Sequence, residues 1–111
     1  MFSVQELVSC DTDQGGCNGG DPYTTFDWIA QVGGLVSWDS YPYTSGNTGN
    51  TGTCQVNPSA RDPSSVPKNT VYVESYSTTA LTNAITQQPV VTMVDASSSI
   101  FQFYVSGKYY L

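Results

Sequence analysis

Three cysteines, Cys10, Cys17 and Cys54, are the residues of this 111-residue chain best suited to covalent chemistry. An odd number leaves at least one thiol unpaired within the chain. The sequence therefore allows three reduced thiols, a zinc site, or an oxidised framework with one thiol left over. Zinc is disfavoured because no histidine and no fourth cysteine completes a set of four ligands. Without histidine, the chain by itself cannot supply a Ser-His-Asp triad or a Cys-His pair.

Two arrangements of carboxylates could also bind or react. Residues 11–16 read Asp-Thr-Asp-Gln-Gly-Gly, like the start of a calcium-binding loop, but an EF-hand would need Glu where Pro22 stands. Glu74 and Asp95 lie on different predicted elements, and nothing indicates that they face each other as a glycosidase pair does. We therefore predict no metal and no cofactor.

The charge balance excludes several classes of partner. Nine acidic residues against three basic ones give a net charge of -6, whereas a nucleic-acid-binding protein needs a basic face to neutralise phosphates. No stretch approaches the roughly 18 apolar residues of a transmembrane helix, so we predict no membrane partner. The N-terminal residues have neither the basic start nor the apolar run of a signal peptide. The low charged fraction of 11%, with 13% aromatic residues, favours a folded chain with an uncharged, loop-rich surface.

Capping signals predict two helices in the first half of the chain. A capping box formed by Ser3 and Glu6 predicts a short helix through about residue 8. Asp21-Pro22 predicts the start of a second helix, with the acid at the N-cap and proline at the first helical position, and Gly33-Gly34 predicts its end. The remaining segments are predicted to be a loop at 10–20, an exposed flexible loop at the Gly-Asn-Thr repeat of 46–52, and an extended, proline-punctuated crossing at 58–67.

The pattern changes near residue 70. Alternation over residues 71–74 predicts a half-buried strand, and the compact β-branched run at 90–94 predicts a buried one. Between them, Ser77 predicts the cap of a short helix that Pro89 stops. A single-turn helix from residues 97–99 through Tyr104, ended by Gly107, and the start of a strand at 108–111 complete the prediction.

Several motifs, taken in order, resemble the papain family (cathepsin L-like) of cysteine proteases. Residues 3–10, Ser-Val-Gln-Glu-Leu-Val-Ser-Cys, precede Gly-Cys-Asn-Gly-Gly at 16–20, Ser-Tyr-Pro-Tyr at 40–43 and Cys54. The closing set comprises Gln88-Pro89-Val90, Asp95-Ala96, Phe101-Gln102, Tyr104, Gly107 and Tyr109-Tyr110. The resemblance implies an α+β, papain-like fold that is incomplete. Residues 1–70 would be the rear of the helical lobe and residues 71–111 the start of the β-barrel lobe.

The same resemblance implies a substrate-binding surface. The second glycine of the pair Gly19-Gly20 would bond an extended substrate through its backbone, since glycine permits that close approach. The pocket for the substrate's second residue from the scissile bond would be lined by Asp21, Pro22 and Met93. Asp21 departs from the family's usual Leu or Tyr. A carboxylate there would favour a basic side chain or simply cap its helix, and we favour the cap. The full set of substrate-binding residues implied is Asn18, Gly19, Gly20, Asp21, Pro22 and Met93.

The resemblance also addresses the cysteines and the catalytic groups. The counterparts of Cys10 and Cys54 pair in the family, which leaves Cys17 free because its partner is not in this chain. No residue here stands at the family's catalytic Cys, His or Asn, so we expect an inactive segment of a peptidase. The alternative is a non-catalytic papain-like module that binds peptides or the family's inhibitors. By resemblance, the partners are peptide or protein substrates and possible protease inhibitors, and the location is secreted or lysosomal.

Overall fold

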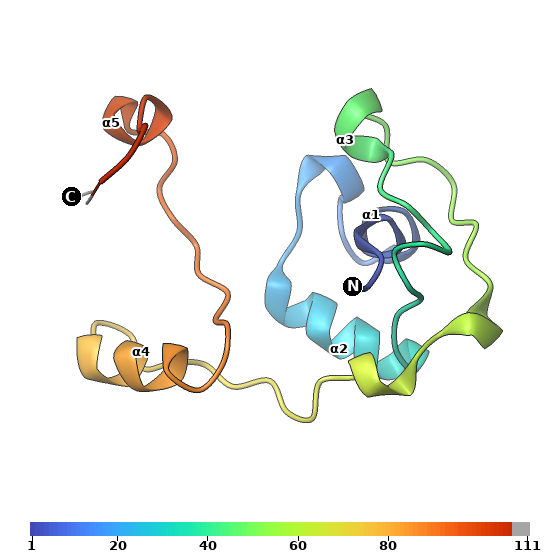
Figure 1. The fold of residues 1–111 in the computed structure, drawn as a ribbon, viewed down its shortest axis with the longest axis horizontal. Helices are drawn as coiled ribbons and strands as arrows, with labels where there is room; N and C mark the ends of the chain where they lie inside the picture. Colours follow the sequence, from blue (N-terminus) through green and yellow to red (C-terminus); the bar gives the residue numbers. More distant parts are fainter. Residues whose placement is uncertain (108–111) are drawn as a thin grey trace. The chain divides into compact units, whose positions relative to one another are not determined.

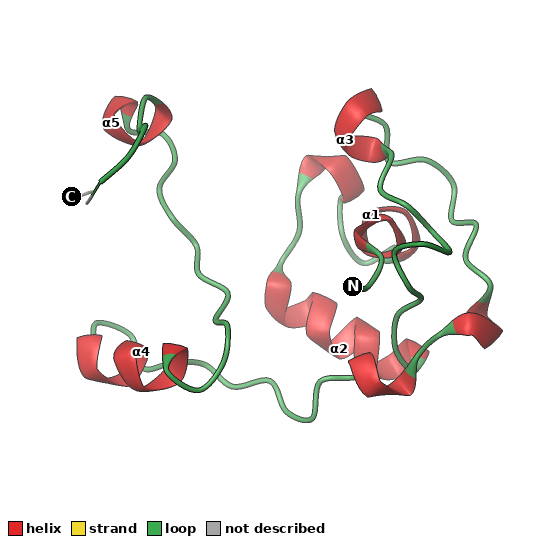
Figure 2. Cartoon of the chain, in the orientation of Figure 1, coloured by secondary structure: helices red, strands yellow, loops and turns green. Residues whose placement is uncertain are grey.

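The structure, a computed structural model, describes residues 1–107. It divides after Tyr72 into two compact units, residues 1–72 and 73–111, which are described separately (Figure 1). Over the described residues, Figure 2 shows helices joined by loops and no strand. The first unit contains α1 (Val4–Cys10), η1 (Gly16–Asn18), α2 (Pro22–Val32), α3 (Ser45–Thr48), η2 (Pro58–Ala60) and η3 (Pro63–Ser65). The second contains α4 (Thr78–Ile85) and α5 (Ser99–Gln102).

The helix caps of the first unit are those that the sequence predicts. The Ser3 hydroxyl accepts the Glu6 N–H at 3.0 Å, which satisfies one of the unpaired donors at the start of α1. The Asp21 carboxylate caps α2 in the same way. Gly33 ends α2 with a φ of 81°, a left-handed conformation that glycine adopts without strain. Helix α1 continues beyond its predicted end, to Cys10.

A small apolar core joins α1 to α2. It consists of Cys10 from α1, Trp28 and Ile29 from α2, and Leu35 from the segment after α2. The disulfide Cys10–Cys54 ties the end of α1 to the chain 44 residues later. Two isolated antiparallel bridges, Phe2 with Ser37 and Leu35 with Asp62, hold the segment after α2 between the N-terminus and the chain near η3.

The strands predicted at 71–74 and 90–94 are wrong for this chain. Neither segment is assigned as strand, and the second is open rather than buried, with Val91 58% and Met93 80% exposed. A β-branched run favours extended backbone, but a strand also needs a neighbour to pair its N–H and C=O groups. Among residues 1–107 no such neighbour lies beside them. The strand predicted at 108–111 falls outside the described residues.

The helix predicted after Ser77 is confirmed as α4, where the Ser77 hydroxyl accepts the Ala80 N–H at 3.2 Å. The helix predicted through Tyr104 is shorter than expected, because α5 ends at Gln102.

Two segments predicted to be irregular contain short helices instead. The repeat at 46–52 is mostly exposed, but it follows Ser45, which is buried and begins α3. The crossing at 58–67 contains η2 and η3. Each begins with a proline that follows Asn57 or Asp62, and the side chain of that preceding residue accepts an N–H two residues on. A fixed proline φ and a side-chain cap thus start a helical turn where the prolines alone predict extended chain.

Candidate functional site

The residues with the most distinctive backbone form a glycine-rich segment, residues 15–21, which links α1 to α2. Its turn is closed by its own backbone: Gly15 N–H donates to Gly19 O at 2.9 Å, and Asn18 N–H donates to Gly15 O at 3.0 Å. Gly19, with a φ of 109°, lies in a region that other residues rarely adopt. The sequence of this segment therefore fixes a tight turn whose second half remains at the surface.

Gly20 differs from its neighbours in leaving its backbone unpaired. Among residues 1–107, neither its N–H nor its C=O makes a hydrogen bond. The residue is exposed, so both groups are accessible to a ligand. An extended peptide that lies alongside could exchange hydrogen bonds with them, as an added strand does at a sheet edge.

Asp21 acts as the N-cap of α2. One carboxylate oxygen accepts the Tyr23 N–H at 2.7 Å and the Thr24 N–H at 3.4 Å. Pro22 occupies the first turn, where its missing N–H costs nothing. The capping interpretation of Asp21 is therefore observed. The other carboxylate oxygen has no hydrogen bond within the described chain, and the side chain is exposed.

The predicted site residues fall in both units. Asn18, Gly19, Gly20, Asp21 and Pro22 are contiguous in the first unit. Met93 belongs to the second unit, where it lines an open hollow with residues that include Tyr76 and Leu81.

The glycine-rich segment is anchored to the rest of its unit by Thr51. The Thr51 hydroxyl accepts the Cys17 N–H at 3.0 Å, while its carbonyl accepts bonds from the Ser9 hydroxyl and the Gln5 amide. Gly16 leaves room for this contact, because a Cβ there would lie 2.5 Å from the threonine side chain. The thiol of Cys17 is exposed and unpaired.

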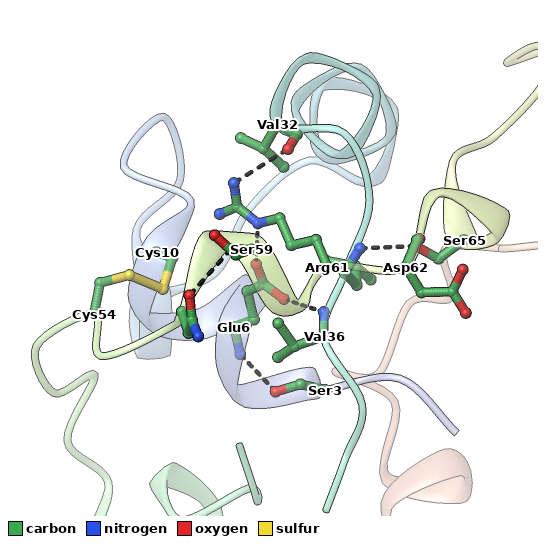
Figure 3. A network of polar contacts seen from close by, with 12 residues as sticks. Ser3, Glu6, Cys10, Val32, Val36, Cys54, Ser59, Arg61, Asp62 and Ser65 are labelled. Atoms are coloured by element: carbon green, nitrogen blue, oxygen red, sulfur yellow. Dashed lines mark hydrogen bonds and ion pairs between the residues drawn. A yellow bond between two sulfur atoms is a disulfide. The ribbon is translucent and has the colours of Figure 1, made fainter. Parts of the chain in front are cut away.

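A buried ion pair elsewhere in the first unit fixes α1. The Glu6 side chain is fully buried, and one carboxylate oxygen lies 2.8 Å from Arg61 Nε while the other accepts the Val36 N–H at 2.7 Å (Figure 3). Arg61 also donates to Val32 O at 3.1 Å and lies over the Trp28 ring, 5.8 Å from its centroid. The pair thus connects α1, the end of α2 and the chain before η3.

Two exposed carboxyl groups have shifted pKa values. Backbone and side-chain hydrogen bonds from Ser64 lower the pKa of Asp62, and those from Ser97, the hydroxyl first, lower the pKa of Asp95. In both cases the bonds stabilise the charged form. These groups cap turns, and neither lies in the glycine-rich segment.

The described residues contain no group of three or more His, Cys, Asp or Glu side chains placed to hold a metal ion. Within the same part of the chain, no helix is long and apolar enough to cross a membrane.

Nothing in the sequence marks Gln14 and Thr51, which hold the glycine-rich segment, or Arg61, which holds α1. Their partners lie 7, 34 and 55 residues away along the chain. No local motif marks such contacts, since polar residues in loops are common and only the folded chain brings the pairs together. The density of glycine on either side of Cys17 was the one available signal of close backbone approach.

One protein family and several plant cysteine endopeptidases are similar to this chain over nearly all of its length. The sequence pattern of the papain family cysteine proteases matches residues 1–111. Cysteine endopeptidase Rep1 of Oryza sativa subsp. japonica is 38% identical over 97% of this chain, and vignain of Ricinus communis is 40% identical over 97%. Zingipain-1 of Zingiber officinale is 36% identical over 96%. The chain spans 28%, 29% and 45% of the lengths of these three relatives. On this evidence, the chain belongs to the papain family of cysteine proteases and corresponds to part of such a protein.

Proposed function

We propose that this chain supplies a substrate-binding wall of a papain-type cysteine peptidase. Within it, the Gly20 backbone would bind an extended peptide by two hydrogen bonds. The observation that carries the proposal is the exposed Gly20, whose N–H and C=O have no partner among residues 1–107. Unpaired backbone groups at the surface are what β-strand addition uses for affinity.

Hydrolysis would need groups that these 111 residues do not contain. Thiol proteolysis requires a thiolate beside an imidazolium, which lowers the thiol pKa and keeps the nucleophile charged. The chain has no histidine, and Cys17 is its only unpaired cysteine. We therefore expect this chain to bind peptides without cutting them, while the peptidase that contains such a segment cuts with residues supplied from elsewhere.

The lobes and the specificity pocket follow from the same proposal. Residues 1–70 would belong to the helical lobe and residues 71–111 to the start of the β-barrel lobe. Asp21, Pro22 and Met93 would line the pocket for the substrate's second residue from the scissile bond. The Asp21 carboxylate oxygen that makes no capping bond supports a contact with a basic side chain there.

The disulfide Cys10–Cys54 supports an oxidising location, secreted or lysosomal. Peptides, protein substrates and the family's inhibitors would compete for this surface.

A nuclear magnetic resonance titration tests the proposal. The ¹⁵N-labelled chain is mixed at pH 6 with an unstructured, blocked tetrapeptide that has a basic third residue. The expected result is a saturable shift of the Gly20 amide, larger than that of any amide in the second unit. The peptide should remain intact after prolonged incubation with reductant.

Two variants frame this test. Gly20→Ala should weaken binding, because its Cβ would lie 2.7 Å from the Gln14 side-chain oxygen and disturb the segment. Asn47→Ala, in the exposed repeat, is the control and should bind as the unmodified chain does. Absence of any Gly20 shift at millimolar peptide would refute the binding role. Catalytic turnover by the purified chain would refute the assignment of an inactive segment.

A further inference from the structure

Gln14 connects the beginning of the glycine-rich segment to the first turn of α2. Its side-chain oxygen accepts the Asp21 N–H at 2.7 Å, and its side-chain nitrogen donates to the Thr24 hydroxyl at 2.7 Å. The partner at Asp21 is a donor, so the amide oxygen must face it and the amide nitrogen must face Thr24. Both ends of the amide are thus committed, and its orientation is fixed.

This contact controls the direction of a second group. The Asp21 N–H and the Gly20 C=O belong to the same peptide unit, which is planar and trans. In such a unit the two groups point in opposite directions. Because Gln14 holds the N–H, it also fixes the Gly20 carbonyl, which points away from the Gln14 amide and has no partner among the described residues.

The close packing at Gly20 shows that the two residues fit together. A Cβ on Gly20 would lie 2.7 Å from the Gln14 side-chain oxygen, 3.2 Å from its Cβ and 3.3 Å from its Cδ. Gln14 therefore covers one side of Gly20 and leaves the other side open. Within the segment, the bond from the Cys17 N–H to the Thr51 hydroxyl ties the turn to the rest of the first unit.

We propose that Gln14 is a positioning residue, which aims the Gly20 carbonyl at the backbone of a bound peptide. The inference rests on the proposed function and adds a residue to it. A glycine pair without this restraint would sample many backbone conformations, and binding would have to order them. Gln14 reduces that cost before the peptide arrives.

Three variants separate hydrogen bonding from bulk. Gln14→Ala removes both bonds, and Gln14→Met keeps the length of the side chain without them. Gln14→Glu retains an oxygen that can accept the Asp21 N–H but loses the donor to Thr24. Gln31→Ala is the matched control, because Gln31 is exposed on α2 and makes no side-chain hydrogen bond in the described chain.

Two measurements are made on each variant. The first is the dissociation constant of the tetrapeptide, from the Gly20 amide shift. The second is the hydrogen-exchange rate of the Asp21 amide without peptide. We expect Gln14→Ala and Gln14→Met to weaken binding about fivefold, the equivalent of losing one net hydrogen bond, and to speed Asp21 exchange by a similar factor. Gln14→Glu should restore most of the peptide affinity and most of the slow exchange of the Asp21 amide. Gln31→Ala should change neither the affinity nor the exchange rate.

Thermal unfolding of each variant shows whether Gln14 only stabilises the fold, in which case the melting temperature falls when Gln14 is replaced. Weaker binding by Gln14→Ala with an unchanged melting temperature, together with rescue by Gln14→Glu, supports positioning. Equal binding by Gln14→Ala and the unmodified chain would overturn it, and so would failure of Gln14→Glu to rescue. If the unmodified chain binds no peptide, the proposed function fails, and the Asp21 exchange rates still decide whether Gln14 orients the peptide unit.

Discussion

Replacing Arg61 with alanine tests how strongly the first unit depends on its buried ion pair. The change would leave the Glu6 carboxylate, whose side chain is fully buried, with the Val36 N–H as the partner of one oxygen and none for the other. Removing one partner of a buried pair costs about 3–5 kcal/mol, because the remaining charge stays desolvated. The bond to Val32 O and the contact with the Trp28 ring would be lost as well.

That loss is large for a unit of this size. A domain of 72 residues has a total stability of roughly 4–11 kcal/mol, so Arg61→Ala should remove about a quarter of it or more. Urea unfolding followed by far-ultraviolet circular dichroism measures the difference in free energy. Tryptophan fluorescence gives a second probe, since both Trp28 and Trp38 lie in this unit, and coincident transitions would show that the unit unfolds in one step.

Two further variants decide whether charge is responsible. The double variant Glu6→Gln with Arg61→Met removes both charges and keeps a side-chain oxygen for the Val36 N–H, so it should recover part of the lost stability. Lys68→Ala changes an exposed cation that makes no hydrogen bond or ion pair among residues 1–107, and it should alter stability by less than about 0.5 kcal/mol. A loss below about 1 kcal/mol for Arg61→Ala would refute the reasoning, as would a double variant no more stable than Arg61→Ala alone.

Two other predictions concern the disulfide and a shifted carboxyl group. Cys54→Ser should lower the free energy of unfolding by about 4 kcal/mol, since the bond to Cys10 closes a loop with a sequence separation of 44 residues. Mass spectrometry after alkylation should find one modifiable thiol in the unmodified chain, and three would contradict the disulfide. Ser97→Ala should raise the pKa of Asp95 toward its ordinary value, because the Ser97 bonds favour the charged form. Their stabilising effect is present above the ordinary pKa and lost as the pH falls through the lowered one. Carboxyl carbon shifts across an acid titration measure this change, and the Asp62 shift should stay constant.

Local chemistry made the helix ends predictable from sequence. Ser3, Asp21 and Gly33 act within a few residues of themselves, so their types and spacing suffice. The stretch at 90–94 was not predictable in this way, because a β-branched run becomes a strand only with a partner beside it. The sequence carries the tendency to extend but does not supply the neighbour within the described residues.

In the candidate site, too, the local features could be predicted from the sequence and the long-range contacts could not. The glycines of the segment were visible because their type alone permits unusual backbone angles and close approach. The roles of Gln14 and Thr51, which hold the segment, could not be predicted from the sequence, because a polar side chain in a loop has many possible partners. Only the fold selects Asp21 for the first and Cys17 for the second.

The hydrogen bonds of the Gln5 side chain determine how freely the repeat at 46–52 can change in length. Its buried oxygen accepts the N–H groups of Thr44 and Ser45, while its nitrogen donates to Ser45 Oγ and Thr51 O. Both ends of the repeat are therefore held by one residue of α1, and residues 46–50 between them are exposed. Since closing a longer loop costs only about 0.6 kcal/mol per doubling, extra Gly-Asn-Thr units could be inserted there with little penalty. A tag or a spectroscopic probe could be accommodated at the same position.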